Sequence, residues 1–442
     1  MKHSIPFQTN PHLTWFVSAK ILGSIQVSLL HTCDIMSKGS EVFDVDEERK
    51  YHFDTLSIHA AEQEDQNQSL NAPIYMTSTF TFTDLQQAED TFSFKRRAYV
   101  YTRGGNPTIN LFEQRLATLE NGADGVAFSS GMAAVSSVVM SFAAAGDSVL
   151  AHRNLYGSTF GFLNHLITNY GIKTQFIDMT DLNIVEESIT PETRVIYLET
   201  PTNPALEIID IEGLCEIAHS KGVKVVVDNT FATPVFQRPL DSGADVVLHS
   251  ATKYISGHGD VVGGFATSKD FDYIQKLKFG YMCELGGVLS PFNAWLLLRG
   301  MKTLGLRMER HEKNATAIAN FLRAQKEVVK TSYPGFEDHP GHELAARQMN
   351  GFGGIISFEL DGPRENAEKF VRNLKLIKLA VSLGDAETLV EVPAMMTHRD
   401  YPEEELHKFG FSARTVRISA GLEHHEDILE DIENALEKVF RQ

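Results

Sequence analysis

Short apolar runs alternate with longer amphipathic stretches through the middle of the chain. Five of the runs are rich in valine and bounded by Gly, Asn, Asp or Pro, and they predict buried strands at 125–128, 148–151, 194–198, 223–227 and 245–248. The stretches between them predict helices at 132–143, 161–169 and 211–219. This alternation predicts an α/β fold with a large parallel-sheet domain that carries helices on both faces. Ligands of such sheets bind at the carboxyl ends of the strands.

The pattern changes after about residue 300, where helices predicted at 306–324 and 425–440 flank strands predicted at 354–360 and 415–419. This predicts a smaller C-terminal α/β domain. We therefore divide the chain into four parts: an extension at 1–50, an N-terminal segment at 51–105, the large domain at 106–304 and the C-terminal domain at 305–442.

The first residues do not fit this scheme. The stretch 13–30 is apolar but is interrupted by Lys20, and it is too short for a confident membrane span. No A-x-A-like cleavage site follows it, and Met36 opens a more ordinary polar beginning. We interpret residues 1–35 as a disordered extension or a start-site artefact.

Composition narrows the possible partners. The 442 residues carry a formal net charge of −18, which repels nucleic acid and anionic membranes, so neither is an expected partner. The only cysteines are Cys33, Cys215 and Cys283. This odd, sparse set gives no disulfide framework and indicates a cytoplasmic protein.

A short segment after the strand predicted at 245–248 carries the clearest chemistry. It reads Ser250-Ala251-Thr252-Lys253 and ends in a Gly-rich turn. The lysine amine is suited to covalent attachment to an aldehyde cofactor. On an extended backbone, Ser250 and Thr252 would lie on one side and reach that cofactor's phosphate. The alternative, a solvated loop lysine, does not explain the two hydroxyls.

Three other segments are weaker evidence for a cofactor site when each is taken alone. Gly131 and Met132 follow a strand and open a helix, an arrangement that presents N–H groups to a phosphate or is simply a connection. Asp228 ends an apolar strand and would pair with a protonated pyridine nitrogen or cap a helix. Tyr101 and Arg103 precede a turn, and the arginine suits phosphate recognition or is part of a surface turn.

Two other kinds of site are disfavoured. A metal site is not expected although the chain has 17 histidines, because the adjacent pair His424-His425 would diverge on a helix. No G-x-G-x-x-G follows a first strand, which argues against a nicotinamide cofactor.

From about residue 51 to its end, the chain resembles the Cys/Met-metabolism family of pyridoxal 5′-phosphate (PLP) enzymes, because all four segments occur in that family's order and spacing. The family includes methionine γ-lyases, cystathionine γ-synthases and γ-lyases, and O-acylhomoserine sulfhydrylases. The resemblance implies the type I, aspartate-aminotransferase-like fold, PLP as cofactor and a tetramer built of two tight dimers. It makes 106–304 the PLP-binding domain and 51–105 a segment that contacts the neighbouring subunit.

The resemblance also implies residue roles. Lys253 binds the cofactor covalently and moves protons, Asp228 pairs with the ring nitrogen, and Tyr156 stacks on the ring and assists the leaving group. The other implied cofactor contacts are Gly131, Met132, Asn203, Ser250 and Thr252 of the same chain, with Tyr101 and Arg103 from the neighbouring subunit. Arg417 would bind the substrate α-carboxylate, beside Ser382.

The implied reaction is γ-elimination on a sulfur amino acid. Val381 is apolar where cystathionine-handling members of the family carry a glutamate, which favours a short thioether such as methionine. Segments 381–387 and 393–398 also look most like methionine γ-lyases. Ser158 and Met282-Cys283 depart from those enzymes, which carry a cysteine and a Lys-Asp pair there.

We expect cleavage of L-methionine to methanethiol, 2-oxobutanoate and ammonia. The alternatives are γ-replacement by an O-acetylhomoserine or O-succinylhomoserine sulfhydrylase, which Ser158 fits, and the reactions of cystathionine γ-synthases or γ-lyases. A catalytically inactive PLP-binding protein is disfavoured, because Lys253, Asp228 and Arg417 are all present.

Overall fold

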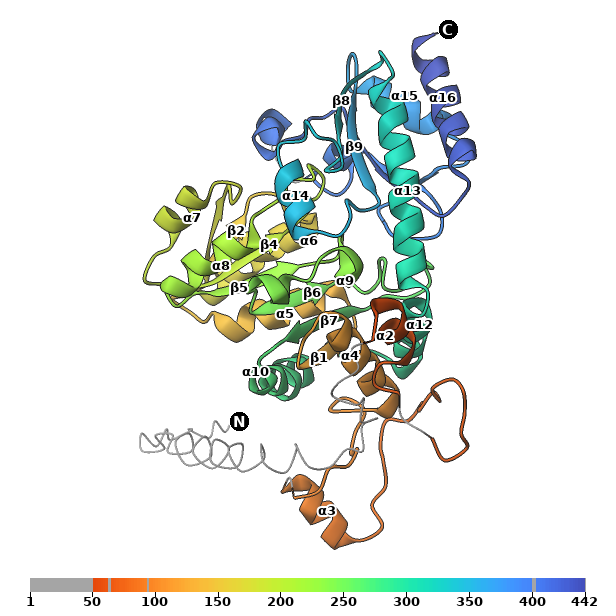
Figure 1. Cartoon of the computed structure of the whole chain (residues 1–442). Helices are drawn as coiled ribbons and strands as arrows, with labels where there is room; N and C mark the ends of the chain where they lie inside the picture. Colours follow the sequence, from red (N-terminus) through yellow and green to blue (C-terminus); the bar gives the residue numbers. More distant parts are fainter. Residues whose placement is uncertain (1–50, 63–64, 94, 400–402, 442) are drawn as a thin grey trace, which may run out of the picture.

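The computed structural model describes residues 51–62, 65–93, 95–399 and 403–441 (Figure 1). The predicted extension at 1–50, with its apolar stretch and Met36, lies outside the described residues. Two sheets organise the rest of the chain, one of seven strands and one of five. Among the helices described, none is long and apolar enough to cross a bilayer.

The larger sheet contains all five strands that the sequence predicts for this region. Its order is β1 (Asp124–Phe128), β7 (Gly264–Ser268), β6 (Val246–His249), β5 (Lys224–Asp228), β4 (Thr193–Glu199), β2 (Ser148–His152) and β3 (Lys173–Ile177). The sequence reading missed two of these, β3 and β7. β3 lies at the sheet edge and contains polar, partly exposed residues, so it lacks a buried apolar run.

The sheet is not parallel throughout. β7 is antiparallel to both β1 and β6, whereas β2 to β6 pair in parallel. No helix separates β6 from β7; the connection is the turn-rich segment that contains Lys253. Without a crossover helix the chain returns antiparallel beside β6, because parallel neighbours need a longer crossover.

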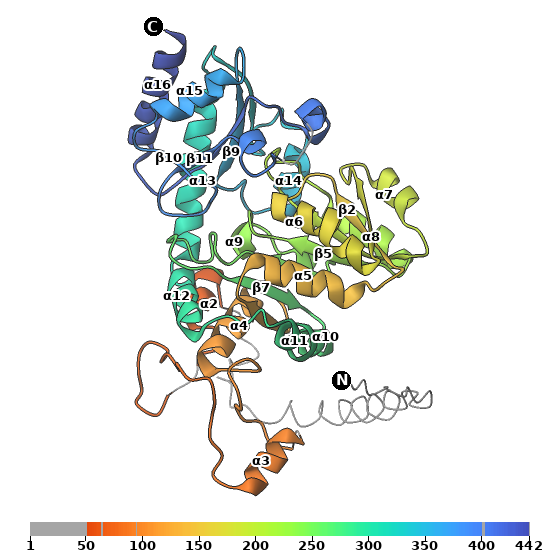
Figure 2. The ribbon, with the colours of Figure 1, turned by 180° about the vertical axis from the view of Figure 1, so that it is seen from behind.

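Helices lie on both sides of this sheet (Figure 2), and apolar clusters bury both of its faces. On β5, Val226 joins a core cluster with residues of α5 (Gly131–Phe142), whereas Val225 and Val227 join the cluster beneath α8 (Ile211–Ser220). Because successive strand side chains point to opposite faces, this run of valines feeds both cores. The second cluster is completed by α7 (Leu182–Ser188). The predicted helices 132–143 and 211–219 are thereby confirmed.

The single helix predicted at 161–169 is wrong in detail. The chain forms α6 (Gly157–Gly161), a π-helical turn η1 (Phe162–Leu166) and a 3-10 turn η2 (Ile167–Tyr170). Apolar spacing located the helical stretch but does not distinguish these hydrogen-bonding patterns.

The smaller sheet has the order β10 (Lys378–Leu379), β11 (Leu389–Glu391), β12 (Thr415–Ser419), β9 (Ile355–Leu360) and β8 (Val328–Ser332). Three helices pack with it: α13 (Leu304–Arg323), α15 (Glu365–Asn373) and α16 (His425–Phe440). Figure 1 shows α13 running from the larger sheet unit to the smaller one. The strands and helices predicted after residue 300 are confirmed within two residues at each end.

The other helices of the described residues are α2 (Phe53–His59), α3 (Leu85–Phe92), α4 (Pro107–Leu119), α9 (Thr233–Phe236), η3 (Pro239–Ser242), α10 (Phe271–Lys276), η4 (Leu277–Met282), α11 (Cys283–Leu285), α12 (Pro291–Met301), α14 (His342–Gln348), η5 (Pro393–Met395) and η6 (Glu403–Phe409). α3 projects from the body in both views (Figures 1 and 2). Several large apolar side chains on and near α3 are exposed in the single chain: Leu70, Met76, Leu85 and Phe92.

Candidate active site

Lys253 lies in the turn that follows β6. Its Nζ donates a hydrogen bond to Ser382 Oγ at 3.3 Å, which joins the turn to the smaller sheet unit. Burial and the Arg417 guanidinium lower the pKa of Lys253, while the carboxylates of Asp385 and Glu391 act in the opposite direction. A half-buried lysine with a depressed pKa is better suited to give and take protons near neutral pH than a solvated lysine.

The turn bearing Lys253 touches the start of α5. A Cβ placed on Gly131 would lie 2.9 Å from Ser250 Cβ, so only glycine allows this approach. Ser130 caps the helix by accepting a hydrogen bond from Ala133 N at 3.1 Å. The N–H groups of Gly131 and Met132 belong to the first helical turn, which lacks partners within a helix and suits a phosphate. The structure therefore brings together Gly131, Met132 and Ser250, three of the residues predicted to contact the phosphate.

Thr252 is placed differently from the prediction. β6 ends at His249 and a turn follows, so the expectation that Ser250 and Thr252 alternate along an extended backbone is wrong. The Thr252 hydroxyl donates to Gly263 O at 3.2 Å and accepts from Gly263 N at 3.0 Å. This side chain fastens the turn to the segment that leads into β7.

Asp228 ends β5 in a half-buried, hydrogen-bonded position. Its Oδ1 accepts from Thr230 N at 3.0 Å and from the Thr230 hydroxyl, and its Oδ2 accepts from Tyr197 at 3.3 Å. Thr230 Oγ1 also accepts from Ser250 N at 2.8 Å, which ties Asp228 to the lysine segment. α9 begins at Thr233 after the N-cap Ala232, so the alternative that Asp228 caps a helix is wrong.

Glu199 is a buried acid next to Asp228, and the sequence analysis did not identify it. It ends β4 directly opposite Asp228 in the sheet register, and its Oε1 accepts from Tyr156 N at 2.9 Å. Burial, followed by the charge of Asp228, raises the pKa of Glu199 well above its usual range, and burial also raises the pKa of Asp228. The signal was available, because Glu199 ends an apolar run just as Asp228 does.

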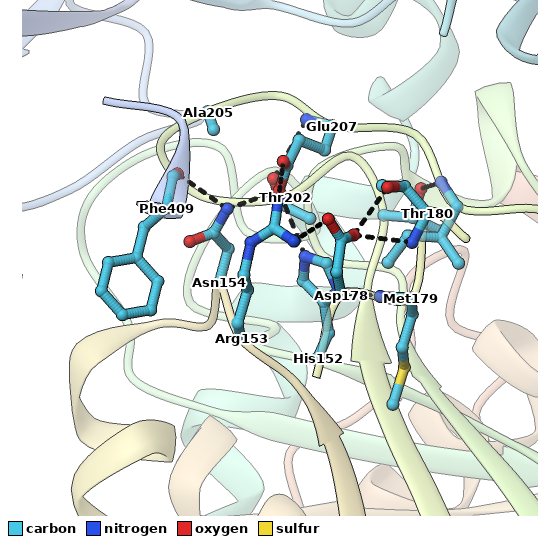
Figure 3. A network of polar contacts seen from close by, with 12 residues as sticks. His152, Arg153, Asn154, Asp178, Met179, Thr180, Thr202, Ala205, Glu207 and Phe409 are labelled. Atoms are coloured by element: carbon cyan, nitrogen blue, oxygen red, sulfur yellow. Dashed lines mark hydrogen bonds and ion pairs between the residues drawn. The ribbon is translucent and has the colours of Figure 1, made fainter. Parts of the chain in front are cut away.

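The loop before Tyr156 is held by Glu207 (Figure 3). Glu207 accepts from His152 Nε2 at 3.2 Å, from Arg153 Nη2 at 2.6 Å and from the Asn154 amide. Arg153 also pairs with Asp178. The Tyr156 side chain itself remains 43 % exposed, at the start of α6.

The same network reaches two other parts of the chain. Glu207 N donates to Thr202 Oγ1 at 3.0 Å, next to Asn203, and the Asn154 amide donates to Phe409 O at 2.8 Å. Met179 N donates to His152 Nδ1 at 3.1 Å, which leaves the hydrogen on Nε2 for Glu207. Burial lowers the pKa of His152, so this histidine is neutral. Glu207 therefore links the loops that carry Tyr156 and Asn203.

Arg417 lies on β12 in the smaller sheet and meets several predicted residues. Its Nη1 donates to Asn203 Oδ1 at 3.0 Å and pairs with Glu391 Oε1 at 2.9 Å, and its Nη2 donates to Ser382 O at 2.9 Å. A guanidinium has five N–H donors, so two remain, and the buried Nε has no hydrogen-bond partner among the described residues. Two free donors suit the two oxygens of a carboxylate.

Tyr101 and Arg103 lie outside this cluster. The Arg103 guanidinium stands 5.7 Å from the centre of the Tyr101 ring, and the backbone oxygen of Arg103 accepts from Cys283 Sγ at 3.2 Å. Both side chains are exposed in the single chain. That they complete a neighbouring subunit's site stays a prediction.

The clustered residues fit PLP. They provide a lysine amine, an acid that could pair with a protonated ring nitrogen, an exposed tyrosine and a helix start for a phosphate. In the part of the chain that the structure describes, no three His, Cys, Asp or Glu side chains are grouped to hold a metal ion.

Comparison with known proteins agrees with this geometry. Residues 54–437 match the family described as Cys/Met metabolism PLP-dependent enzyme. An L-methionine gamma-lyase of Fusobacterium nucleatum is 46% identical over 395 residues, which cover 89% of this chain and 100% of that protein. A cystathionine gamma-lyase of Bacillus subtilis is 45% identical over 386 residues, covering 87% of this chain and 99% of that protein.

A solved structure is also similar. The cystathionine gamma-lyase of Lactobacillus plantarum, complexed with L-serine, superposes with a TM-score of 0.83 at 42% identity, covering 88% of this chain and 99% of that one. The type I fold and the PLP cofactor expected from the sequence are thereby confirmed. The chain belongs to the Cys/Met-metabolism family of PLP-dependent enzymes.

Proposed function

We propose that this enzyme cleaves L-methionine and water to methanethiol, 2-oxobutanoate and ammonia by γ-elimination. The observation that carries the proposal is Val381, whose side chain is 59 % exposed and precedes Ser382, the hydrogen-bond partner of Lys253. An apolar side chain there offers no charge to the distal amine and carboxylate of cystathionine and accommodates a methyl thioether. Several relatives at 44–46% identity are L-methionine gamma-lyases, which supports the same substrate.

The chain's own groups divide the work. PLP, when bound, withdraws electrons from the α-carbon of an amino acid. Arg417 binds the α-carboxylate with its two free N–H donors, and the amine of Lys253 removes the α-proton. Asp228 would pair with the ring nitrogen and favour its protonated form, and the exposed Tyr156 hydroxyl protonates the departing methanethiolate.

The catalytic site is proposed to need two subunits, with Tyr101 and Arg103 binding the phosphate in the neighbour's site. The exposed apolar side chains on and near α3 support a dimer, and the family resemblance supports a tetramer of two dimers. We place the enzyme in the cytoplasm, on the basis of its sparse cysteines.

A γ-replacement reaction is the second candidate. Ser158 is exposed on α6, two residues after Tyr156, where methionine γ-lyases carry a cysteine. The residue at this position fits an O-acylhomoserine sulfhydrylase, which would join sulfide to the γ-carbon with loss of the acyl group as a carboxylate.

One substrate panel tests the assignment. Purified enzyme is supplied with L-methionine, L-homocysteine, cystathionine, or O-acetylhomoserine with and without sulfide, and initial rates are compared. We expect methanethiol and 2-oxobutanoate from methionine without an added nucleophile. Homocysteine formation from O-acetylhomoserine and sulfide at a far higher rate would replace the lyase assignment with the sulfhydrylase.

A matched variant tests the role of Val381. Val381→Glu should shift the preference from methionine toward cystathionine, because the new carboxylate attracts the distal ammonium group. The control is Val329→Glu on β8, which adds the same charge at an exposed valine of the smaller sheet. An unchanged substrate ratio in Val381→Glu would show that another position sets specificity.

A further inference from the structure

A left-handed turn presses the segment 382–385 against the lysine turn. Gly384 has φ +77°, and a Cβ on it would lie 2.7 Å from Tyr254 N, the residue after Lys253. Gly384 N also donates to Ser419 Oγ at 3.0 Å, which fixes the turn to β12. Glycine is required here by both conformation and space. The residue that follows, Asp385, is thereby brought next to the lysine.

Asp385 is a buried acid to which neither the family resemblance nor the reaction above gives a role. It is 7 % exposed, and its Oδ1 has no hydrogen-bond partner among the described residues. A Cβ placed on Gly259 would lie 3.4 Å from its Cγ, so the carboxyl also borders the far end of the lysine turn. A buried carboxyl oxygen without a partner is costly, which points to a group that the site presents during the reaction.

The Lys253 ammonium is a candidate for that group, because its charge lowers the pKa of Asp385 and the Lys253 Nζ lies 3.3 Å from Ser382 Oγ in the same segment. Burial raises the pKa of Asp385, whereas hydrogen bonding with Ser382 and the charge of Lys253 lower it, and Glu387 raises it. The charged groups that face Lys253 are Arg417, which disfavours its ammonium form, and Asp385 and Glu391, which favour it. Glu391 Oε1 is already paired with Arg417, whereas Asp385 forms no ion pair among the described residues. Both acids keep one buried oxygen without a hydrogen-bond partner, but only Asp385 has no cation of its own.

We propose that Asp385 is a positioning residue that acts on Lys253 through Ser382. The Asp385 carboxylate orients the Ser382 hydroxyl as a donor toward itself, so that the lone pair of Oγ faces Lys253 Nζ. This arrangement holds the lysine in place when it carries the α-proton and offsets the nearby guanidinium. The inference rests on the proposed role of Lys253 in the reaction, but not on which sulfur amino acid is the substrate.

The test uses the PLP-loaded enzyme. Its readout is the visible absorbance of the cofactor, which changes when the Lys253 nitrogen attached to the cofactor gains or loses a proton. In Asp385→Asn the pH midpoint of this change should fall by about one unit, because a nearby negative charge is removed. The matched control is Glu387→Gln, which removes a charge from an exposed residue of the same segment. A midpoint in Asp385→Asn equal to that of Glu387→Gln would overturn the proposal.

A second set of variants tests the link through Ser382. Ser382→Ala should lower the midpoint as well, and the double variant should lower it no further than Ser382→Ala alone. Fully additive shifts would show that Asp385 acts independently of Ser382. Asp385→Glu, which keeps the charge, should titrate nearer to the wild type, and this comparison holds even if Asp385→Asn folds poorly.

A kinetic readout separates this proposal from the substrate assignment. The exchange of the α-hydrogen of L-alanine with D2O requires proton transfer at Lys253 but no elimination, and in Asp385→Asn it should slow about tenfold at constant KM. Normal exchange and an unshifted midpoint would overturn the role of Asp385 alone. A wild-type enzyme without the lysine-linked cofactor band would instead overturn the assignment of Lys253.

Discussion

Arg417 and Glu391 face each other across β12 and β11 and form a buried ion pair, with Nη1 and Oε1 2.9 Å apart. Both side chains are 3 % exposed or less. The pair fixes one edge of the guanidinium and leaves the Nε side free for a carboxylate. An interaction inside the smaller sheet therefore orients the group that is expected to bind the substrate.

This pair predicts that Glu391→Gln will weaken substrate binding. The neutral amide keeps the shape but no longer holds the guanidinium by charge, so KM should rise about tenfold, the equivalent of about 1.4 kcal/mol, with a smaller change in kcat. Initial rates over a range of methionine concentrations measure both constants. Glu359→Gln, which disturbs the more exposed pair with Arg414 in the same sheet, is the control and should leave KM unchanged. An equal KM in both variants would argue against the orienting role.

Glu199 predicts a pH-dependent change in stability. Its folded pKa is raised well above an ordinary value of 4.5, so the favourable burial of its neutral form is complete below pH 4.5 and is lost as pH rises through the folded pKa. Glu199→Gln keeps a neutral acceptor for Tyr156 N. Because glutamine does not ionise, the variant does not lose stability as pH rises. The melting temperature of the variant relative to the wild type should therefore increase from pH 5 to pH 8.

Glu192→Gln provides the control for that measurement. Hydrogen bonding with Thr190 lowers the pKa of Glu192, so its substitution should show no such increase with pH. A difference in melting temperature for Glu199→Gln that stays constant or falls with pH would contradict a protonated Glu199.

The contacts of Glu207 lead us to expect that Glu207→Gln lowers both the reaction rate and the stability of the enzyme. Glu207→Gln removes the charge that binds Arg153 and disturbs the acceptor of His152 and Asn154, so unfolding should become easier by about 1–3 kcal/mol. The loop before Tyr156 loses its support, so kcat should fall more than KM rises. Glu212→Gln, on the exposed side of α8, is the matched control for denaturant unfolding and kinetics. Unchanged kcat together with reduced stability would confine Glu207 to a structural role.

Arg103 predicts complementation between subunits. Arg103→Ala should bind PLP more weakly, and mixing it with Lys253→Ala should restore activity, because a mixed dimer contains one site with both residues intact. Subunit exchange is confirmed by mass spectrometry of the mixture before the assay. No recovery in an exchanged sample would place Arg103 in the site of its own subunit.

The sequence by itself determined where most strands and helices lie, and that Lys253, Asp228 and the helix start at Gly131 each follow or end a strand. The valine-rich run before Asp228 reads as a buried strand because Val225, Val226 and Val227 are consecutive apolar residues, and the structure confirms a strand there at β5. The helix at 425–440 and the strand at 415–419 were predictable to the residue, because amphipathic spacing and flanking polar residues are local properties.

Only the tertiary structure decided which charges meet. Glu199 and Asp228 lie 29 positions apart and become neighbours through strand register, and Glu207 reaches His152 across 55 positions. Asp385 gains its position from the left-handed turn at Gly384 and from contact with a turn more than a hundred residues earlier. Local apolar patterns report which residues are buried, but the energy of a buried charge depends on the partners that the fold places beside it. For this reason the cofactor segments were readable from the sequence, whereas the contacts that Glu199, Glu207 and Asp385 make with them were not.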